Sequence, residues 1–214
     1  MLMNRFEVWE NGLTSLIPYR EWIIRSRVSK FFSSFANNVV NKTVLEIGSG
    51  SGAGARVVNR YFFPKNIIAS ELDSRLVETA KRYTKDTNIL FEQQDAAILK
   101  YKNNTFDAVF DFKVIHHIPN PQWKHCLNEV YWVLRRGGKF FIIDQSIESF
   151  ETLWGRILRL FFSHPYDSLY TKQEFTEYLK KIGYKILLSK QTHEYFVIVV
   201  EKRTPCCQEN YLLG

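Results

Sequence analysis

The segment that most constrains the fold is a short apolar strand that leads through a glycine-rich turn into a helix. It reads VLEIGSGSGAGA over residues 44–55. Gly48 permits a sharp turn after the strand, and Gly50 lets a ligand touch the backbone. The amides at the start of the following helix favour a polar or negatively charged group. The turn therefore predicts a ligand site, although Gly48, Gly50 and Ala53 also satisfy the pattern of dinucleotide-binding folds.

Strands and helices alternate along the rest of the chain. The expected strands cover 43–47, 66–70, 88–93, 106–111 and 139–144. The expected helices cover 53–62, 73–85, 121–135 and 171–182, the third ending at Gly137-Gly138 and the fourth running from a Thr171 cap to Gly183. Two further strands, 184–189 and 194–202, form an antiparallel hairpin. This alternation predicts an α/β fold with a parallel sheet and helices on both faces.

Two regions are expected outside this alternation. Apolar residues recur at helical spacing from about Tyr19 to Ala36, and Pro18 suits a helix start. An insertion near 146–170 resembles a lid, because its segment 151–162 is apolar and aromatic on a helical period. The expected organisation is an N-terminal helical cap, a main domain and a flexible tail: 1–42, 43–203 and 204–214.

Charge and composition favour a soluble basic enzyme. The formal net charge is +7 over 214 residues, and Lys and Arg never form a run of five or six. A nucleic-acid surface or an anionic membrane surface is the alternative reason for such a charge. The three cysteines, an odd number, fit reduced thiols in the cytoplasm. We expect neither a signal peptide nor a transmembrane segment, since no stretch of 18 apolar residues occurs.

Three carboxylates lie in or after the first three expected strands. Glu46 is inside an apolar strand, where burial is costly unless a cationic or hydrogen-bonding group meets it. A ligand ammonium group would do so, and a strand-edge Glu that faces solvent is the alternative. Glu71 ends the second strand, where a carboxylate accepts both hydroxyls of a ribose, while Asp73 is better placed to cap the next helix. Asp95 would accept from an adenine amino group, or is simply a loop aspartate.

Together these segments resemble the class I S-adenosylmethionine (SAM)-dependent methyltransferases. The resemblance rests on the glycine-rich segment, Glu71, the loop Gln94-Asp95-Ala96, TFDAVFDFKVIHHIPN (105–120) and VLRRGGKFFIID (133–144), in that order. It covers roughly residues 40–202 and is strongest to the broad branch that includes quinone-biosynthesis methyltransferases. It implies a Rossmann-like, seven-stranded, mostly parallel sheet with a C-terminal antiparallel hairpin. It also implies SAM as cofactor and S-adenosylhomocysteine as product.

The resemblance implies contacts to each part of the cofactor. The glycines would approach the amino-acid part of SAM, Glu71 the ribose, and Asp95 with the Ala96 amide the adenine. The backbone at Asp111 and Phe112 would meet the methionine end. The predicted cofactor-binding residues are Glu46, Gly48, Ser49, Gly50, Gly52, Glu71, Leu72, Asp95, Ala96, Asp111 and Phe112. No metal site is predicted.

Candidates for the chemistry follow the fourth and fifth expected strands. His117 and Asp144 are the candidate catalytic residues, and loop architecture or capping is the alternative for each. The cap helix, which carries Arg25 and Phe31, and the insertion would shape the acceptor pocket. Their aromatic residues favour a small apolar or aromatic acceptor under a lid, with plain core packing as the alternative. The predicted pocket residues are Tyr19, Trp22, His116, Trp154 and His164.

The predicted activity is methyl transfer from SAM to a small molecule. A protein or nucleic-acid methyltransferase, and a non-catalytic SAM- or nicotinamide-binding module, are the alternatives. No nucleic-acid partner is expected, because the chain reads Asp111-Phe112-Lys113-Val114 where methyltransferases of nucleic-acid bases would carry an Asn/Asp-Pro-Pro-aromatic motif. No role is assigned to Lys113. Arg156 and Arg159 beside the aromatic residues of the insertion leave weak peripheral membrane contact open.

Overall fold

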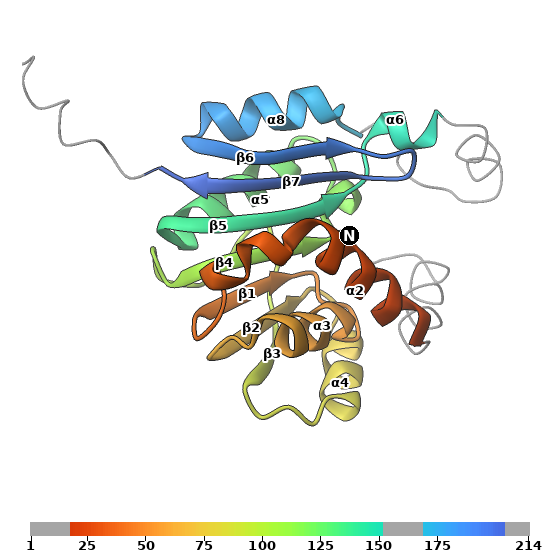
Figure 1. Cartoon of the computed structure of the whole chain (residues 1–214), viewed down its shortest axis with the longest axis vertical. Coiled ribbons are helices and arrows are strands. Elements are labelled where there is room, and N and C mark those ends of the chain that lie inside the picture. Colours follow the sequence, from red (N-terminus) through yellow and green to blue (C-terminus); the bar gives the residue numbers. More distant parts are fainter. Residues whose placement is uncertain (1–17, 152–168, 204–214) are drawn as a thin grey trace, which may run out of the picture.

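A seven-stranded sheet forms the centre of the structure, a computed structural model that describes residues 18–151 and 169–203 (Figure 1). The strands are β1 (Thr43–Ile47), β2 (Asn66–Glu71), β3 (Ile89–Gln93), β4 (Phe106–Phe112), β5 (Leu134–Asp144), β6 (Tyr184–Gln191) and β7 (Phe196–Lys202). Their order is β3-β2-β1-β4-β5-β7-β6. The first five strands of that order are parallel, and β7 is antiparallel to β5 and β6. The predicted Rossmann-like sheet with its antiparallel hairpin is confirmed.

Helices cover both faces of this sheet (Figure 1). One face carries α2 (Pro18–Phe32), α3 (Ala53–Phe62) and α4 (Ser74–Tyr83), and the other carries α5 (Gln122–Val133) and α8 (Lys172–Lys181). The short elements are α6 (Ile147–Phe150) and two 3-10 turns, Ser33–Asn38 and Ile115–His117. Because each central strand is covered on both sides, neighbouring residues such as Val44 and Leu45 are both buried, in separate clusters.

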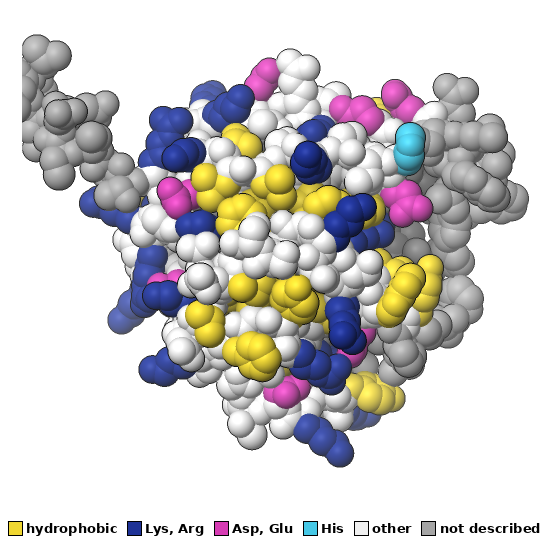
Figure 2. All heavy atoms as spheres, in the orientation of Figure 1, with side chains coloured by type: hydrophobic (Ala, Val, Ile, Leu, Met, Phe, Trp, Pro, Cys, Tyr) yellow, Lys and Arg dark blue, Asp and Glu magenta, His cyan; other side chains and the backbone are white. Residues whose placement is uncertain are grey.

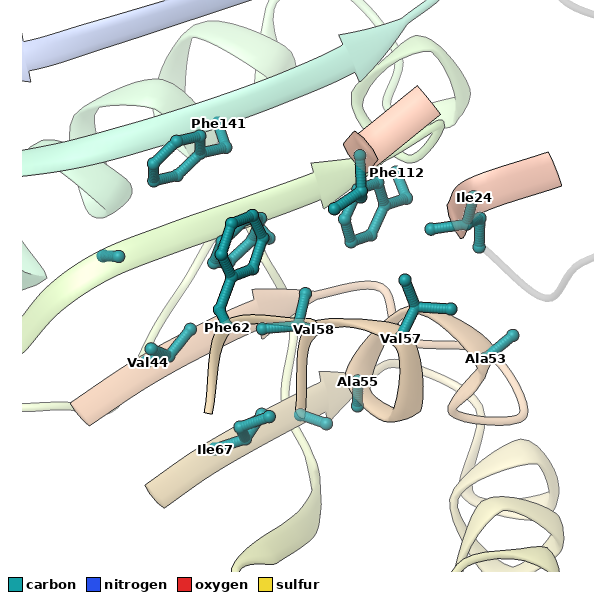
Figure 3. Close-up of a cluster of buried hydrophobic side chains, with 14 of the residues drawn as sticks. Ile24, Val44, Ala53, Ala55, Val57, Val58, Phe62, Ile67, Phe112 and Phe141 are labelled. Carbon is teal, nitrogen blue, oxygen red and sulfur yellow. The ribbon is translucent and has the colours of Figure 1, made fainter. Parts of the chain in front are cut away.

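Stacked phenylalanines form the centre of the core beneath α2 and α3. The rings of Phe110 and Phe141 are nearly parallel, with centroids 4.6 Å apart. Phe32 of α2 and Phe62 of α3 pack against the Phe141 ring at 5.1 and 6.5 Å. Figure 3 labels Phe62 and Phe141 of this group, together with Ile24 of α2. The described part of the predicted cap is therefore packed against the sheet as part of its helical layer.

The largest difference from the sequence prediction lies between α5 and β5. The helix does not continue to Gly137-Gly138 but ends at Val133, and β5 begins at Leu134. Leu134 has an extended backbone and pairs with Phe106 of β4. The strand register then shifts before the regular pairing with β4 resumes. The glycines therefore belong to an irregular strand start, because pairing with β4 stabilises the extended backbone ahead of them.

The other predicted elements agree closely with the structure. The first predicted helix begins at Pro18 as expected, but its regular part ends at Phe32 and a 3-10 turn follows. The Thr171 hydroxyl accepts from the Glu174 amide at 3.0 Å, which confirms the predicted cap. The predicted helix over 151–162 and the tail lie outside the described residues, except for Glu151. No helix within 18–151 and 169–203 has the length and apolar character needed to cross a membrane.

The phenylalanine stack makes a testable contribution to stability. Phe141 is fully buried, so Phe141→Ala is expected to lower the free energy of unfolding by about 3–5 kcal/mol. Phe63→Ala is the matched control, since that ring is 67% exposed and its loss is expected to cost less than about 1 kcal/mol. Urea unfolding followed by circular dichroism measures both. Equal losses would show that the stack is not the centre of the core.

Candidate functional site

The glycine-rich turn lies at the carboxyl end of β1, between the ends of β2 and β4. The Gly50 amide donates to Oε2 of Glu71 at 2.8 Å, and the Asp73 amide donates to Oε1 at 3.1 Å. The Ser49 amide donates to the Ser70 carbonyl at 2.9 Å. The Glu71 carboxylate thus joins the turn to the start of α4, and each of its oxygens has further capacity to accept. Asp73 caps α4, as predicted, by accepting from the Arg75 amide.

The backbone at Gly50 leaves a small space that α2 closes. Gly50 has a φ of +56°, a left-handed conformation that glycine adopts without strain. Within the described residues, a Cβ at this position would meet the guanidinium of Arg20, at 3.8 and 3.9 Å. Arg20 is in the first turns of α2, so this helix brings a positive charge to the glycine turn.

Glu46 is a buried carboxylate behind the same turn. Its side chain is 3% exposed, which excludes the solvent-facing alternative. A Cβ on Gly54 would overlap Oε1 of Glu46, and the Ala55 amide donates to this carboxylate. Oε2 has no hydrogen-bond partner within the described residues. Burial raises the pKa of Glu46 to about 8, although the positive charge of Arg20 opposes this effect.

The residues predicted to contact the ribose and the adenine lie next to one another at the ends of β2 and β3. The Gln94 amide donates to the Glu71 carbonyl at 3.0 Å, which holds the 94–97 loop beside the end of β2. Asp95 is exposed, and its Oδ1 accepts from the Ala97 amide at 2.8 Å. Leu72 is 49% exposed beside them. An apolar side chain and a loop carboxylate thus flank Glu71.

A buried polar cluster occupies the ends of β4 and β5. Asp144 is fully buried and accepts from the Tyr170 hydroxyl at 3.0 Å, the His116 amide at 3.1 Å and the Gln145 amide at 2.7 Å. Its Oδ1 also contacts Nδ1 of His116. Of the two predicted catalytic residues, Asp144 contacts His116, and His117 is exposed with its ring centroid 4.0 Å from that of His116.

Asp111 belongs to this cluster as well. Its Oδ1 accepts from the Val114 amide at 3.0 Å, and Oδ2 has no hydrogen-bond partner among the residues the structure describes. Burial, together with the negative charge of Asp144, raises the pKa of Asp111 well above the ordinary carboxyl value. Burial and the neighbouring negative charge therefore favour the protonated form of Asp111.

Sequence reasoning missed three cations at this edge. Arg20 and Arg27 are half-buried on α2, whereas the Arg25 that was associated with the pocket is exposed. Lys113 follows β4 and is half-buried too. The seven-residue spacing of Arg20 and Arg27, which puts both on one helix face, was the available signal. Elsewhere Lys and Arg are spread over the surface in Figure 2.

Two predicted pocket residues stand at the exposed start of α2. Tyr19 and Trp22 are 60% and 63% exposed, and their rings stack with centroids 6.0 Å apart. The Phe112 side chain points into the core, where it stacks on Phe110 at 5.8 Å. Trp154 and His164 lie outside the described residues.

Comparison with known proteins identifies the family. Residues 44–138 match the family described as a methyltransferase domain. A fatty-acid O-methyltransferase from Mycolicibacterium smegmatis is 35% identical over 107 residues, which are 50% of this chain and 38% of that protein. A phosphoethanolamine N-methyltransferase from Plasmodium falciparum is 24% identical over 79% of this chain and 64% of its own length. The chain thus spans less than two thirds of these relatives.

Solved structures agree in fold. A chain of the complex between the Haloferax volcanii Trm112 methyltransferase activator and a putative methyltransferase superposes with a TM-score of 0.78. It is 15% identical, and the match covers 95% of this chain and 98% of that one. Residues 44–138 are thus a methyltransferase domain of the class I SAM-dependent superfamily. SAM is accordingly its cofactor.

The site residues fit that cofactor on structural grounds. Oε2 of Glu46 lacks a partner within the described residues, and the amino-acid part of SAM carries an ammonium group that donates hydrogen bonds. The Glu71 carboxylate has acceptor capacity left for ribose hydroxyls. The space at Gly50 is bounded by a cation suited to a carboxylate. The individual contacts to SAM stay predictions.

Burial of Glu46 makes a pH-dependent contribution to the stability of the cofactor-free protein. Its pKa is raised to about 8 from 4.5, so the unfolded chain loses this proton first as the pH rises. The stability that protonated Glu46 contributes is fully present below the pKa of this residue in the unfolded chain. It is lost as the pH rises through the pKa of Glu46 in the folded protein. Between about pH 5 and about pH 9, the free energy of unfolding of the wild type is expected to fall by an amount on the order of a few kcal/mol because of Glu46. In Glu46→Gln this part of the fall is expected to be absent.

Urea unfolding at the two pH values, without SAM, measures this difference. Glu78→Gln is the control, because Glu78 is an exposed residue of α4 and its substitution is expected to leave the pH dependence unchanged. The same pH dependence in wild type and Glu46→Gln would contradict the buried, protonated state of Glu46.

Proposed function

We propose that the protein transfers a methyl group from SAM to a small acceptor with an apolar or aromatic part. The observation that carries the proposal is the unpartnered, buried Oε2 of Glu46 behind a glycine turn whose Gly50 amide is held by Glu71. A buried carboxylate oxygen without a partner is destabilising. Its retention in the strand is accounted for by a ligand that donates to it.

Each part of the site has a proposed role in holding SAM. Glu46 would accept from the ammonium group, and Arg20 would meet the carboxylate of the same amino-acid part. Glu71 would accept from the ribose hydroxyls. Asp95 and the Ala96 amide would hold the adenine. When bound, SAM supplies a methyl group on a positively charged sulfur and leaves as S-adenosylhomocysteine.

The remaining work of the protein is to align the acceptor and to manage its proton. Holding the acceptor in line with the methyl group lowers the entropic part of the barrier. His117 is exposed beside the buried cluster, and we assign it the role of base for acceptors that lose a proton. Asp144 would act through His116, which it holds by both the ring and the amide, and so position this loop.

Two observations support the acceptor class. The exposed, stacked rings of Tyr19 and Trp22 offer an apolar surface at the start of α2. The relatives named above are a fatty-acid and a phosphoethanolamine methyltransferase, both named for small molecules. A small-molecule acceptor therefore fits better than a macromolecule.

Calorimetric titration with S-adenosylhomocysteine tests the cofactor site. We expect the wild type to bind S-adenosylhomocysteine and not to bind NADH. Glu71→Ala is expected to weaken binding by about 1–3 kcal/mol, because buried polar groups lose their partner. Glu78→Ala on α4 is the matched surface control.

Methyl transfer from labelled SAM to octanoate and to aromatic alcohols tests the activity itself. Binding of NADH in place of S-adenosylhomocysteine would overturn the proposal.

Proton release on binding tests the role of Glu46. With a pKa of about 8, Glu46 is mostly protonated at pH 7, and an ammonium group beside it favours ionisation. Binding of S-adenosylhomocysteine is therefore expected to release up to about one proton in the wild type and none from this site in Glu46→Gln. Titrations in buffers of different ionisation enthalpy measure the release. Identical proton release by both proteins would exclude Glu46 as the ammonium partner.

A further inference from the structure

Three cations converge at the carboxyl edge of the sheet, beside the glycine turn. The Arg20 guanidinium lies against Gly50. The guanidinium carbon of Arg27 lies 4.1 Å from the centroid of the Tyr195 ring, and its Nη2 lies 3.6 Å from Oε2 of Glu194. Lys113 directly follows β4 at this edge, where its amide is bonded to the Ile143 carbonyl of β5, and both arginines act electrostatically on it.

The fold holds these residues in place through contacts outside the cluster. Ile24, which lies between the two arginines in sequence, is buried in the core, so the helix face that carries them is turned inward. Glu21 pairs with Arg56 and Arg60 of α3 at 2.6 and 3.0 Å, which anchors the start of α2. The turn that carries Glu194 and Tyr195 lies at the same edge, because Phe196 pairs with Asp144 at the end of β5.

Lys113 is the unusual member of this group. Its φ is +66°, and its amide donates to the Ile143 carbonyl at 2.8 Å, so its backbone is held at the end of β4. Within the described residues its Nζ makes no hydrogen bond and no ion pair. Burial, with the positive charges of Arg27 and Arg20, lowers the pKa of Lys113 to about 8, against the opposing effects of Asp144 and Glu194.

The nearby carboxylates compensate this charge poorly. The Glu194 side chain is 75% exposed, so solvent screens its charge. Asp144 is already engaged by Tyr170, Gln145 and His116. Half-buried cations in such surroundings are stabilised by an anion that forms charge-assisted hydrogen bonds with them.

We propose that Lys113 and Arg27 form a subsite for an oxyanion, a carboxylate or a phosphate, carried by the methyl acceptor. The inference rests on the proposed function and adds the charge of the substrate to it. Arg20, which is the cation next to Gly50, serves the cofactor carboxylate, and the other two cations serve the acceptor. Tyr19 lies within electrostatic reach of Arg27, so the apolar body of such an acceptor would extend toward the exposed Tyr19–Trp22 pair.

The test measures ligand affinity in the full-length protein saturated with S-adenosylhomocysteine. The probes are octanoate, octyl phosphate and uncharged octanol. The variants are Lys113→Gln, which removes the charge, and Lys113→Arg, which keeps it. Arg25→Gln is the matched control, because it removes one positive charge from an exposed position of α2. The affinity of each variant for S-adenosylhomocysteine is measured separately.

We expect the wild type to bind octanoate or octyl phosphate more tightly than octanol. The anion that binds more tightly identifies the subsite as one for a carboxylate or for a phosphate. Lys113→Gln should weaken anion binding about tenfold and leave octanol binding within about twofold. Lys113→Arg and Arg25→Gln should retain anion binding.

Loss of affinity for S-adenosylhomocysteine in Lys113→Gln would overturn the inference, since the cluster would then serve the cofactor. Equal binding of octanol and the anions by the wild type would also overturn it and would leave the proposed function standing. Failure of the wild type to bind S-adenosylhomocysteine would instead overturn the proposed function, and the inference with it.

Discussion

A carboxylate buried at the centre of the sheet is the constraint around which the candidate site is built. Glu46 stands in β1 with almost no exposure. Its neighbours match that burial: Gly54 leaves room for the side chain, the Ala55 amide donates to it, and Arg20 offsets part of its electrostatic cost. These contacts come from α3 and α2, so the layer that covers the sheet also forms the site. The packing of the helical layer and the geometry of the candidate site therefore depend on the same contacts.

Helix α2 connects the core to the candidate site. Phe32 packs on the Phe110–Phe141 stack, and Glu21 binds two arginines of α3. The same helix presents Arg20 to the glycine turn. A rigid helix transmits the position of its buried end to its polar end. Changes in the phenylalanine core should consequently alter the geometry of the cofactor site.

The polar residues at the ends of β4 and β5 fall into a buried group and an exposed one. Asp144, His116 and Tyr170 are buried and bonded to one another, and Asp111 is buried beside them with one oxygen lacking a partner among the described residues. Such a cluster stabilises one arrangement of the strand ends, since a partly satisfied buried network is costly. His117 lies exposed next to this group, with its ring centroid 4.0 Å from that of His116. The buried cluster thus fixes the strand ends, and His117 lies beside it at the surface.

The sequence by itself determined the order of elements, the glycine turn and the places of Glu46 and Glu71 in and at the end of their strands, because periodicity and strand-end position are local properties of the chain. Tertiary structure decided the start of β5, since Leu134 pairs with a strand about 28 residues away. It also decided that Asp144 contacts His116 and that Lys113 lies within electrostatic reach of two arginines of α2. These pairings depend on side-chain directions set by packing between distant segments, which spacing along the chain does not encode.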